Sequence, residues 1–238
     1  MSRGLPEPPA TARALPGVRT ARAVVLVEGP SDQVALETLA ARRGRDLEAE
    51  HVAVVPTGGV HAVGRFLRRF GPRGAALRLA GLCDEGEVAV VCGALENAGF
   101  GADLSVGEME RFGFFVCATD LEHELVRSLG SDTVTEVIAA QGELGAFQTF
   151  QKQPAKRELG LEEQLWRFMW NRKIRYAPLL VGALELDRVP RALDGVLAHV
   201  RAGSSDGLVV GARRDEAERE NWHTFVSLLA RFRHPLLP

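Results

Sequence analysis

The sequence predicts an α/β protein with a largely parallel sheet flanked by helices, followed by a helical C-terminal region. Short apolar runs, each closed by glycine, proline or acidic residues, indicate buried strands. Amphipathic stretches about a dozen residues long separate these runs and indicate helices. Because strands that alternate with helices are joined by right-handed crossovers, this pattern is typical of a parallel sheet.

The elements of the α/β part follow one another in a regular order. The first predicted strand covers residues 23–27, and the helix after it can be capped by Ser31 or Asp32. The second strand is closed by the turn Pro56-Thr57-Gly58-Gly59. The other predicted elements are strands at 51–55, 75–83 and 113–117 and helices at 60–70 and 88–97.

The pattern changes beyond Gly130, where helical spacing continues without a convincing strand. We therefore expect a disordered leader at 1–22, an α/β domain at 23–130 and a helical region at 131–238. The expected helices of this last region lie at 134–150, 162–170, 177–186, 192–201 and 213–233, with a flexible break at 203–207.

Composition limits the classes of function. A chain of 238 residues with 46% hydrophobic residues can bury a normal core, and its net charge of −2 gives no global attraction to nucleic acid. Any nucleic-acid surface must therefore be local.

The three cysteines have no metal-ligand spacing, which favours buried thiols in a reducing cytosol. No apolar run is long enough to span a bilayer, so we expect a cytoplasmic protein without a membrane partner.

Carboxylates follow three of the predicted strands. Because the carboxyl ends of parallel strands meet at one edge of a sheet, these side chains are expected to gather there. Like charges held together need a compensating cation, and oxygen ligands without a histidine cluster or thiolate pair favour Mg²⁺ or Mn²⁺. Such an ion suits phosphodiester chemistry. The candidate metal ligands are Glu28, Asp32, Asp84, Glu85, Glu87, Asp120, Glu122 and Glu124.

The stretch from Val25 to Asp32 resembles the first motif of the TOPRIM domain, which topoisomerases, primases and OLD-family (overcoming lysogenisation defect) nucleases share. Together with Thr57-Gly58-Gly59, it is most similar to the OLD branch. The resemblance covers roughly residues 22–126 and implies a Rossmann-like TOPRIM fold. It also implies a metal-binding or general acid/base glutamate at Glu28 with Asp32 beside it, an acidic pair beginning at Asp84, and a later acidic position at Asp120 and Glu122.

Two departures from the family pattern matter. Gly86 stands where the second acid of the pair is expected, so either Glu85 or Glu87 substitutes for it, or one of two metals is held poorly. OLD nucleases also carry an ATPase domain before the TOPRIM part, whereas this chain has no Gly-rich Lys-Ser/Thr loop. We therefore expect a standalone TOPRIM protein whose ATPase, if it has one, is a separate partner subunit.

Candidate nucleic-acid contacts lie at Gly58 and Gly59, which form either a simple turn or a close backbone approach to phosphate. A second group, Arg172, Lys173 and Arg175, is either ordinary solvated surface or a phosphate-binding patch. The resemblance implies a functional lysine downstream of the acids, for which Lys173 is the candidate. Trp166, Phe168 and Trp170 are interpreted as helix-packing residues.

These features lead to a hypothesis of divalent-metal-dependent phosphodiester hydrolysis, with Glu28 and Lys173 as catalytic residues. We expect a bacterial DNA endonuclease of the OLD type, acting in DNA repair or phage defence, with its oligomeric state left open. One alternative is a catalytically degenerate module that binds nucleic acid or a partner protein. The other is a phosphoryl-transfer enzyme that acts on RNA or a nucleotide.

Overall fold

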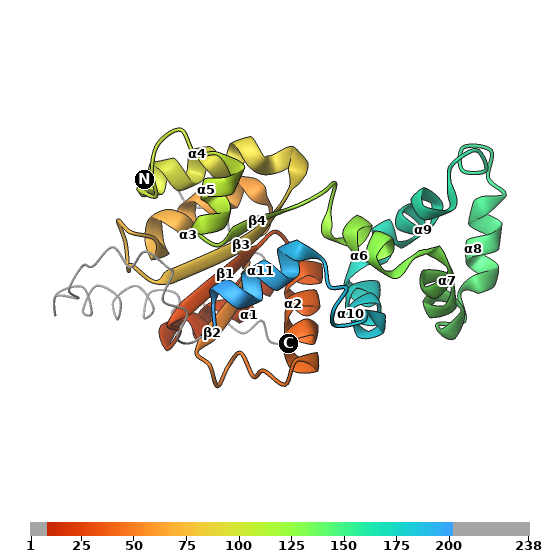
Figure 1. Ribbon diagram of the computed structural model, residues 1–238, viewed down its shortest axis with the longest axis horizontal. Coiled ribbons are helices and arrows are strands. Elements are labelled where there is room, and N and C mark those ends of the chain that lie inside the picture. Colours follow the sequence, from red (N-terminus) through yellow and green to blue (C-terminus); the bar gives the residue numbers. More distant parts are fainter. Residues whose placement is uncertain (1–8, 202–238) are drawn as a thin grey trace, which may run out of the picture. The chain divides into compact units, whose positions relative to one another are not determined.

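The computed structural model describes residues 9–201, which form a four-stranded parallel sheet in the order β2-β1-β3-β4 (Figure 1). In β1 and β2 every residue is buried, as expected of parallel strands covered on both faces. Their register pairs Val25 with Val54, and β3 follows on the other side of β1. The strands are β1 (Ala23–Val27), β2 (Val52–Pro56), β3 (Arg78–Asp84) and β4 (Phe114–Cys117).

Helices cover both faces of the sheet. Figure 1 shows α3 and α4 on one face, with α2 and α11 on the other. The α-helices of the first part are α1 (Pro9–Ala14), α2 (Pro30–Arg42), α3 (Val63–Phe70), α4 (Val88–Ala98) and α5 (Val106–Arg111). Short 3-10 turns are η1 (Leu15–Arg19), η2 (Val60–Ala62) and η3 (Glu85–Glu87).

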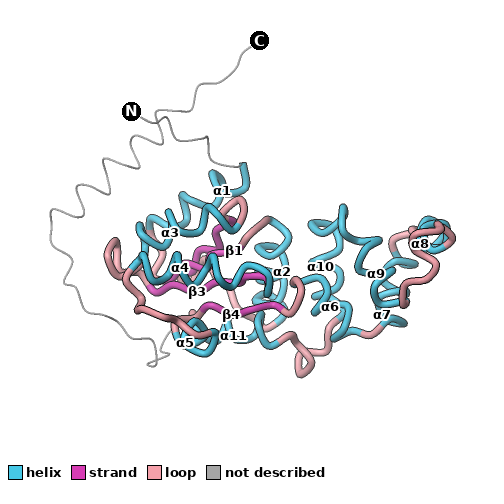
Figure 2. Tube along the Cα trace, turned by 90° about the horizontal axis from the view of Figure 1, so that it is seen from above, coloured by secondary structure: helices cyan, strands magenta, loops and turns pink. Residues whose placement is uncertain are grey.

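The rest of the described chain is helical, and Figures 1 and 2 both show α6 to α10 gathered together, with α10 beside α2. These elements are α6 (Leu121–Leu129), α7 (Ser131–Ala140), α8 (Leu144–Gln151), α9 (Leu161–Met169), η4 (Trp170–Arg172), α10 (Lys173–Ala183) and α11 (Arg191–His199). A single cluster of buried apolar residues joins Val25 and Leu36 of the α/β part to Leu180 and Val196 of the helical part. The hydrophobic core is therefore continuous across residue 130.

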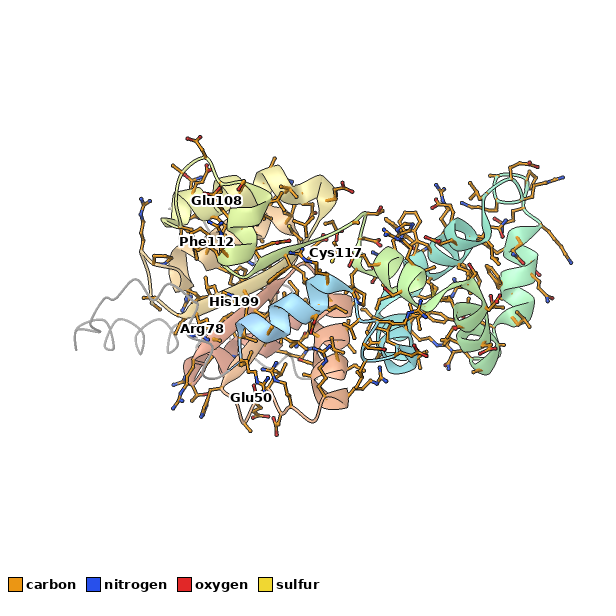
Figure 3. All side chains as sticks on the ribbon, in the orientation of Figure 1. Glu50, Arg78, Glu108, Phe112, Cys117 and His199 are labelled. Carbon is orange, nitrogen blue, oxygen red and sulfur yellow. The ribbon has the colours of Figure 1, made fainter. Side chains whose placement is uncertain are left out.

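Helix α11 returns from the helical region to the sheet. It contacts β3 and β4, and a Cβ at Gly195 would lie 2.3 Å from the ring of Phe115, so only glycine allows this close approach. At the C-terminal end of the helix, Arg78 Nη1 donates to the carbonyl oxygen of His199 at 3.4 Å (Figure 3). These contacts hold the helix against the β3–β4 side of the sheet.

The α/β fold with helices flanking a parallel sheet is confirmed, and β1 has the predicted bounds. The single helix expected at 134–150 is divided into α7 and α8, with Gly142 at φ 72° between them. Helix α5 was not predicted, although its capping box of Ser105 and Glu108 was a readable signal. The expected break at 203–207 and the helix at 213–233 lie outside the described residues.

Within the leader that was expected to be disordered, α1 and η1 make residues 9–19 helical, and they contact the sheet. Thr11 is buried, and its hydroxyl donates to the carbonyl oxygen of Pro56 at 2.5 Å. Helix α1 and η1 both contact β2, the edge strand.

Cys83, Cys92 and Cys117 are free thiols. Among residues 9–201, no helix has the length and apolar character needed to cross a membrane.

Candidate metal and nucleic-acid site

The strand order places the site between β1 and β3. From β1 the chain crosses to β2 on one side, and from β2 it crosses back to β3 on the other side. Such a switch in direction opens a crevice at the carboxyl ends of the two central strands, where α/β proteins commonly bind ligands. Glu28 directly follows β1, and Asp84 is the last residue of β3.

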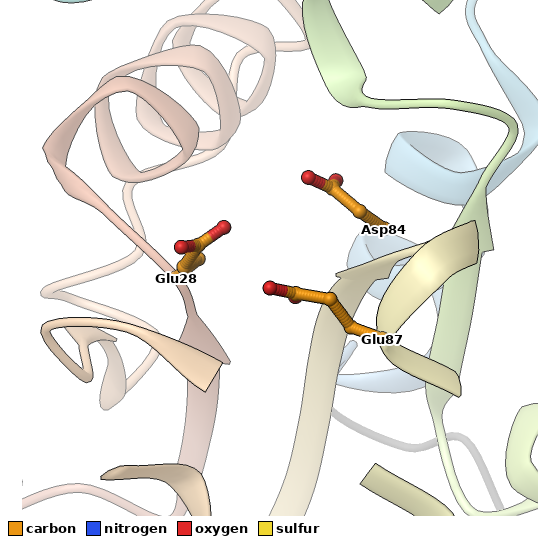
Figure 4. A group of neighbouring side chains, drawn as sticks. All are labelled: Glu28, Asp84 and Glu87. Carbon is orange, nitrogen blue, oxygen red and sulfur yellow. The ribbon is translucent and has the colours of Figure 1, made fainter. Parts of the chain in front are cut away.

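Three carboxylates meet at this point: Glu28, Asp84 and Glu87, which we call the acidic cluster. One ligand oxygen from each lies within 4.8 Å of the others (Figure 4). Glu28 is exposed, and the other two are half-buried. Hard oxygen donors at this separation fit a divalent cation such as Mg²⁺ or Mn²⁺ better than zinc.

A short 3-10 turn explains why Glu87 joins the cluster. Asp84 precedes η3 and Glu87 ends it, and residues three apart in a 3-10 helix project from the same side. Glu85, between them, has an exposed side chain and is not part of the cluster. The chain thus supplies a second acid from this strand end three residues after the first, beyond Gly86.

The loop after β2 holds the backbone of Glu28. The N–H groups of Gly58 and Gly59 donate to the carbonyl oxygen of Glu28 at 3.1 and 3.3 Å. Both glycines have positive φ, 82° and 112°, which side chains with a Cβ rarely adopt. These two amides therefore already have an acceptor in the loop, and they position Glu28.

Burial and mutual repulsion perturb the carboxyl groups around the cluster. Burial raises the pKa of Asp84 to about 8, and the charges of Asp120 and Asp32 add to the shift. Burial likewise raises the pKa of Asp32 to about 7, although the Gly29 N–H, which donates to Asp32 Oδ2 at 2.9 Å, opposes this shift. Burial and the charge of Glu28 raise the pKa of Glu87. A bound cation would relieve this accumulation of negative charge.

Asp120, Glu122 and Lys173 form a second group, and the charges of Asp120 and Glu122 contribute to the raised pKa values of Asp84 and Asp32, respectively. Lys173 Nζ is 2.9 Å from Asp120 Oδ2 and 2.7 Å from Glu122 Oε2. Burial lowers the pKa of Lys173, but its two carboxylate partners outweigh burial and hold that pKa above the usual value. Burial raises the pKa of Glu122, whose Oε1 is buried without a partner.

Asp120 is saturated with hydrogen bonds. Its Oδ1 accepts from the His123 N–H at 2.8 Å, which caps α6, and from Trp166 Nε1 at 3.0 Å. Its Oδ2 accepts from Lys173 Nζ and also lies 3.1 Å from Trp166 Nε1. With both oxygens engaged and only 4% of the residue exposed, Asp120 is built to position Lys173 and Trp166.

Glu124 braces the loop between β4 and α6. Its Oε1 accepts from the Ala118 N–H at 2.8 Å. The next residue, Thr119, has φ 69°, a left-handed conformation that is strained for a β-branched side chain. This loop presents Asp120 to Lys173.

Both candidate phosphate-binding arginines, Arg172 and Arg175, pair with Glu143, the residue just before α8. Arg175 Nη1 contacts Glu143 Oε1, and Arg172 Nε lies 3.7 Å from Glu143 Oε2. Their side chains remain 48% and 41% exposed. The charge of Glu143 therefore offsets part of the positive charge that the sequence suggested for this surface.

Trp166 donates a hydrogen bond to Asp120 at the candidate site, a contact that the sequence interpretation missed. Trp166, Trp170 and Lys173 are spaced i, i+4 and i+7, which on a helix places them on one face. This spacing could have linked the two tryptophans to the site, because Lys173 was already a candidate catalytic residue. Phe168 packs in the core as expected, whereas Trp170 is 52% exposed.

Comparison with known proteins gives one family and several structures. Residues 20–79 match the family described as overcoming lysogenization defect protein-like, TOPRIM domain. The C-terminal region of the Xanthomonas campestris pv. campestris OLD protein superposes with a TM-score of 0.60 at 22% identity, over 88% of this chain and 99% of that one. The corresponding region of the Burkholderia pseudomallei OLD protein gives 0.59 at 20% identity, over 76% and 97%. Comparison with curated protein sequences gives no match.

The family match ends at residue 79, before Asp84. For the acidic residues from Asp84 onward, the similarity to OLD proteins is therefore a similarity of fold. The resemblance drawn from the first motif is confirmed: the chain is similar to an OLD-like TOPRIM protein over residues 20–79, and its fold is that of the C-terminal regions of OLD proteins.

Proposed function

We propose that the protein hydrolyses phosphodiester bonds of nucleic acid with a divalent metal, as a DNA endonuclease of the OLD type. The observation that carries the proposal is the acidic cluster, whose oxygens lie within 4.8 Å of one another at the ends of two adjacent strands. The family match over β1 and β2 supports a nuclease-type domain.

Glu28, Asp84 and Glu87 would hold the cation, with Asp32 beside them. When bound, Mg²⁺ or Mn²⁺ lowers the pKa of a water ligand and offsets charge on the phosphoryl oxygens. Glu28, the exposed member of the cluster, would also accept the proton of the attacking water.

Lys173 would carry a fixed positive charge at the reacting phosphate. Its ammonium is held by Asp120 and Glu122, and its raised pKa keeps it charged at neutral pH. A preorganised cation of this kind stabilises charge on the leaving oxygen without reorganising during the reaction. Gly58 and Gly59 would shape the adjacent rim, and Arg172 and Arg175 would contact phosphates farther along the strand.

Plasmid cleavage tests the proposal. The wild type should nick or linearise supercoiled DNA in Mg²⁺ or Mn²⁺, and EDTA should stop the reaction. Glu28→Gln should abolish cleavage, while Glu85→Gln, which alters an exposed acid outside the cluster, should retain it. No metal-dependent cleavage by the wild type, with metal binding retained, would favour the binding module instead. A separate ATPase subunit, if one exists, would be expected to raise activity when it is added with ATP.

A further inference from the structure

Trp170 exposes an aromatic surface beside the site. It is 52% exposed, and the ammonium of Lys173 lies 4.8 Å from its ring centroid. The same ammonium lies 2.7 Å from Glu122. The indole is therefore separated from the site carboxylates by one side chain.

The ring of Trp166 holds the ring of Trp170 in its orientation. The two rings meet edge to face, with centroids 5.1 Å apart and planes at 88°. Trp166 is in turn anchored, because its N–H donates to both carboxylate oxygens of Asp120. An aromatic ring held in place before binding loses little conformational entropy when a ligand stacks on it.

The neighbourhood of Trp170 combines apolar surface with the ammonium of Lys173, which is itself paired with Asp120 and Glu122. Ile174, one helical turn farther on, is 58% exposed. Lys173 lies between the two in sequence and carries its charge beside the ring. An exposed aromatic face next to a cation is the arrangement with which proteins stack the bases of a single strand and attract its backbone.

We propose that Trp170 stacks on an unpaired nucleobase next to the bond to be cleaved. The protein would therefore prefer nucleic acid with unpaired bases at the site, such as single strands or frayed ends, over a continuous duplex, whose bases are already stacked. This inference rests on the proposed function, since it names the substrate class for the same site.

Binding without cleavage tests the inference. A fluorescein-labelled oligo-dT strand and a fully paired, blunt-ended duplex of equal length are titrated with protein in EDTA, and anisotropy is recorded. Trp170→Ala should weaken oligo-dT binding by about 5- to 150-fold, the factor that corresponds to about 1–3 kcal/mol per stacked base. Trp170→Phe should retain most of the affinity, and duplex binding should change little. Leu186→Ala, which removes another exposed apolar side chain, should bind both probes as the wild type does.

Three results would overturn the inference. These are unchanged oligo-dT binding by Trp170→Ala, an equal loss for both probes, and a wild type that does not bind oligo-dT. Because the titration needs no metal, a protein that fails to cleave plasmid but loses oligo-dT affinity in Trp170→Ala would reject the nuclease and keep the stacking residue.

Discussion

Lys173 Nζ lies 2.7 Å from Glu122 Oε2, and this ion pair joins the first residue of α10 to the first turn of α6. Glu122 is only 2% exposed, and 27% of the Lys173 side chain is exposed. The lysine is thus both the cation of the candidate site and the partner that allows a glutamate to be buried there. Its two roles give different experimental signatures.

Lys173→Met should destabilise the fold, because it leaves two buried carboxylates without their cation. Breaking a buried pair costs about 3–5 kcal/mol, and partial exposure of the lysine places this case near 3 kcal/mol. Urea denaturation measures the change, with Lys152→Met as an exposed control. Restoring stability by adding Asp120→Asn and Glu122→Gln would show that the loss comes from the buried charges. If Lys173→Met lost no more unfolding free energy than Lys152→Met, the ion pair of Lys173 would not stabilise the fold.

The metal-free protein should lose stability as pH rises from about 5 to about 8. Asp84 has a pKa of about 8 and Asp32 one of about 7, both above the values of the unfolded chain. Between the unfolded and folded values the folded state binds more protons, so raising the pH favours unfolding. Thermal melts in EDTA should show this decline, and Asp84→Asn should flatten it. The stabilisation by Mn²⁺ should grow over the same range, because the ligands must lose their protons. A metal-free stability that rises with pH in this window would be inconsistent with raised carboxyl pKa values.

Gly195→Ala should destabilise the packing of α11 on the sheet. The new Cβ would lie 2.3 Å from the ring of Phe115, and overpacking of this kind typically costs about 1–3 kcal/mol. Gly182→Ala in α10 is the matched control, because a Cβ there would meet nothing within 4 Å. In that control alanine should be neutral or stabilise the helix by up to about 1 kcal/mol. Equal denaturation midpoints for the two variants would show that α11 does not pack closely on Phe115.

Replacing Arg172 and Arg175 with alanine should weaken binding to DNA of any sequence. Each lost phosphate contact lowers the salt slope of the binding constant by about one, so the double variant should lower it by about two. The measurement is DNA affinity over a series of salt concentrations. Arg111→Ala with Arg127→Ala is a control in which two exposed arginines outside this group are removed. If the salt slope of the double variant equals that of the control, Glu143 keeps these arginines from the phosphates.

The sequence was sufficient to predict the α/β core, because β1 is a continuous apolar run, most residues of the other strands are apolar, and Glu28 follows β1 directly. It left open whether Glu85 or Glu87 replaces the missing acid at Gly86, since that depends on the 3-10 geometry of η3. The partners of Asp120 could not be predicted, because Trp166 lies 46 residues away and Lys173 lies 53 away. The pairing of Arg172 and Arg175 with Glu143 likewise depends on how α10 packs beside α7.

The most direct test of the account is a calorimetric Mn²⁺ titration of the wild type, Glu87→Gln and Glu85→Gln. The two variants remove one acid each, two residues apart on the same short turn, and only Glu87 belongs to the acidic cluster. The wild type and Glu85→Gln should bind Mn²⁺ equally, while Glu87→Gln should bind at least about tenfold more weakly. Equal weakening by both variants, or a wild type that binds no Mn²⁺, would contradict this prediction.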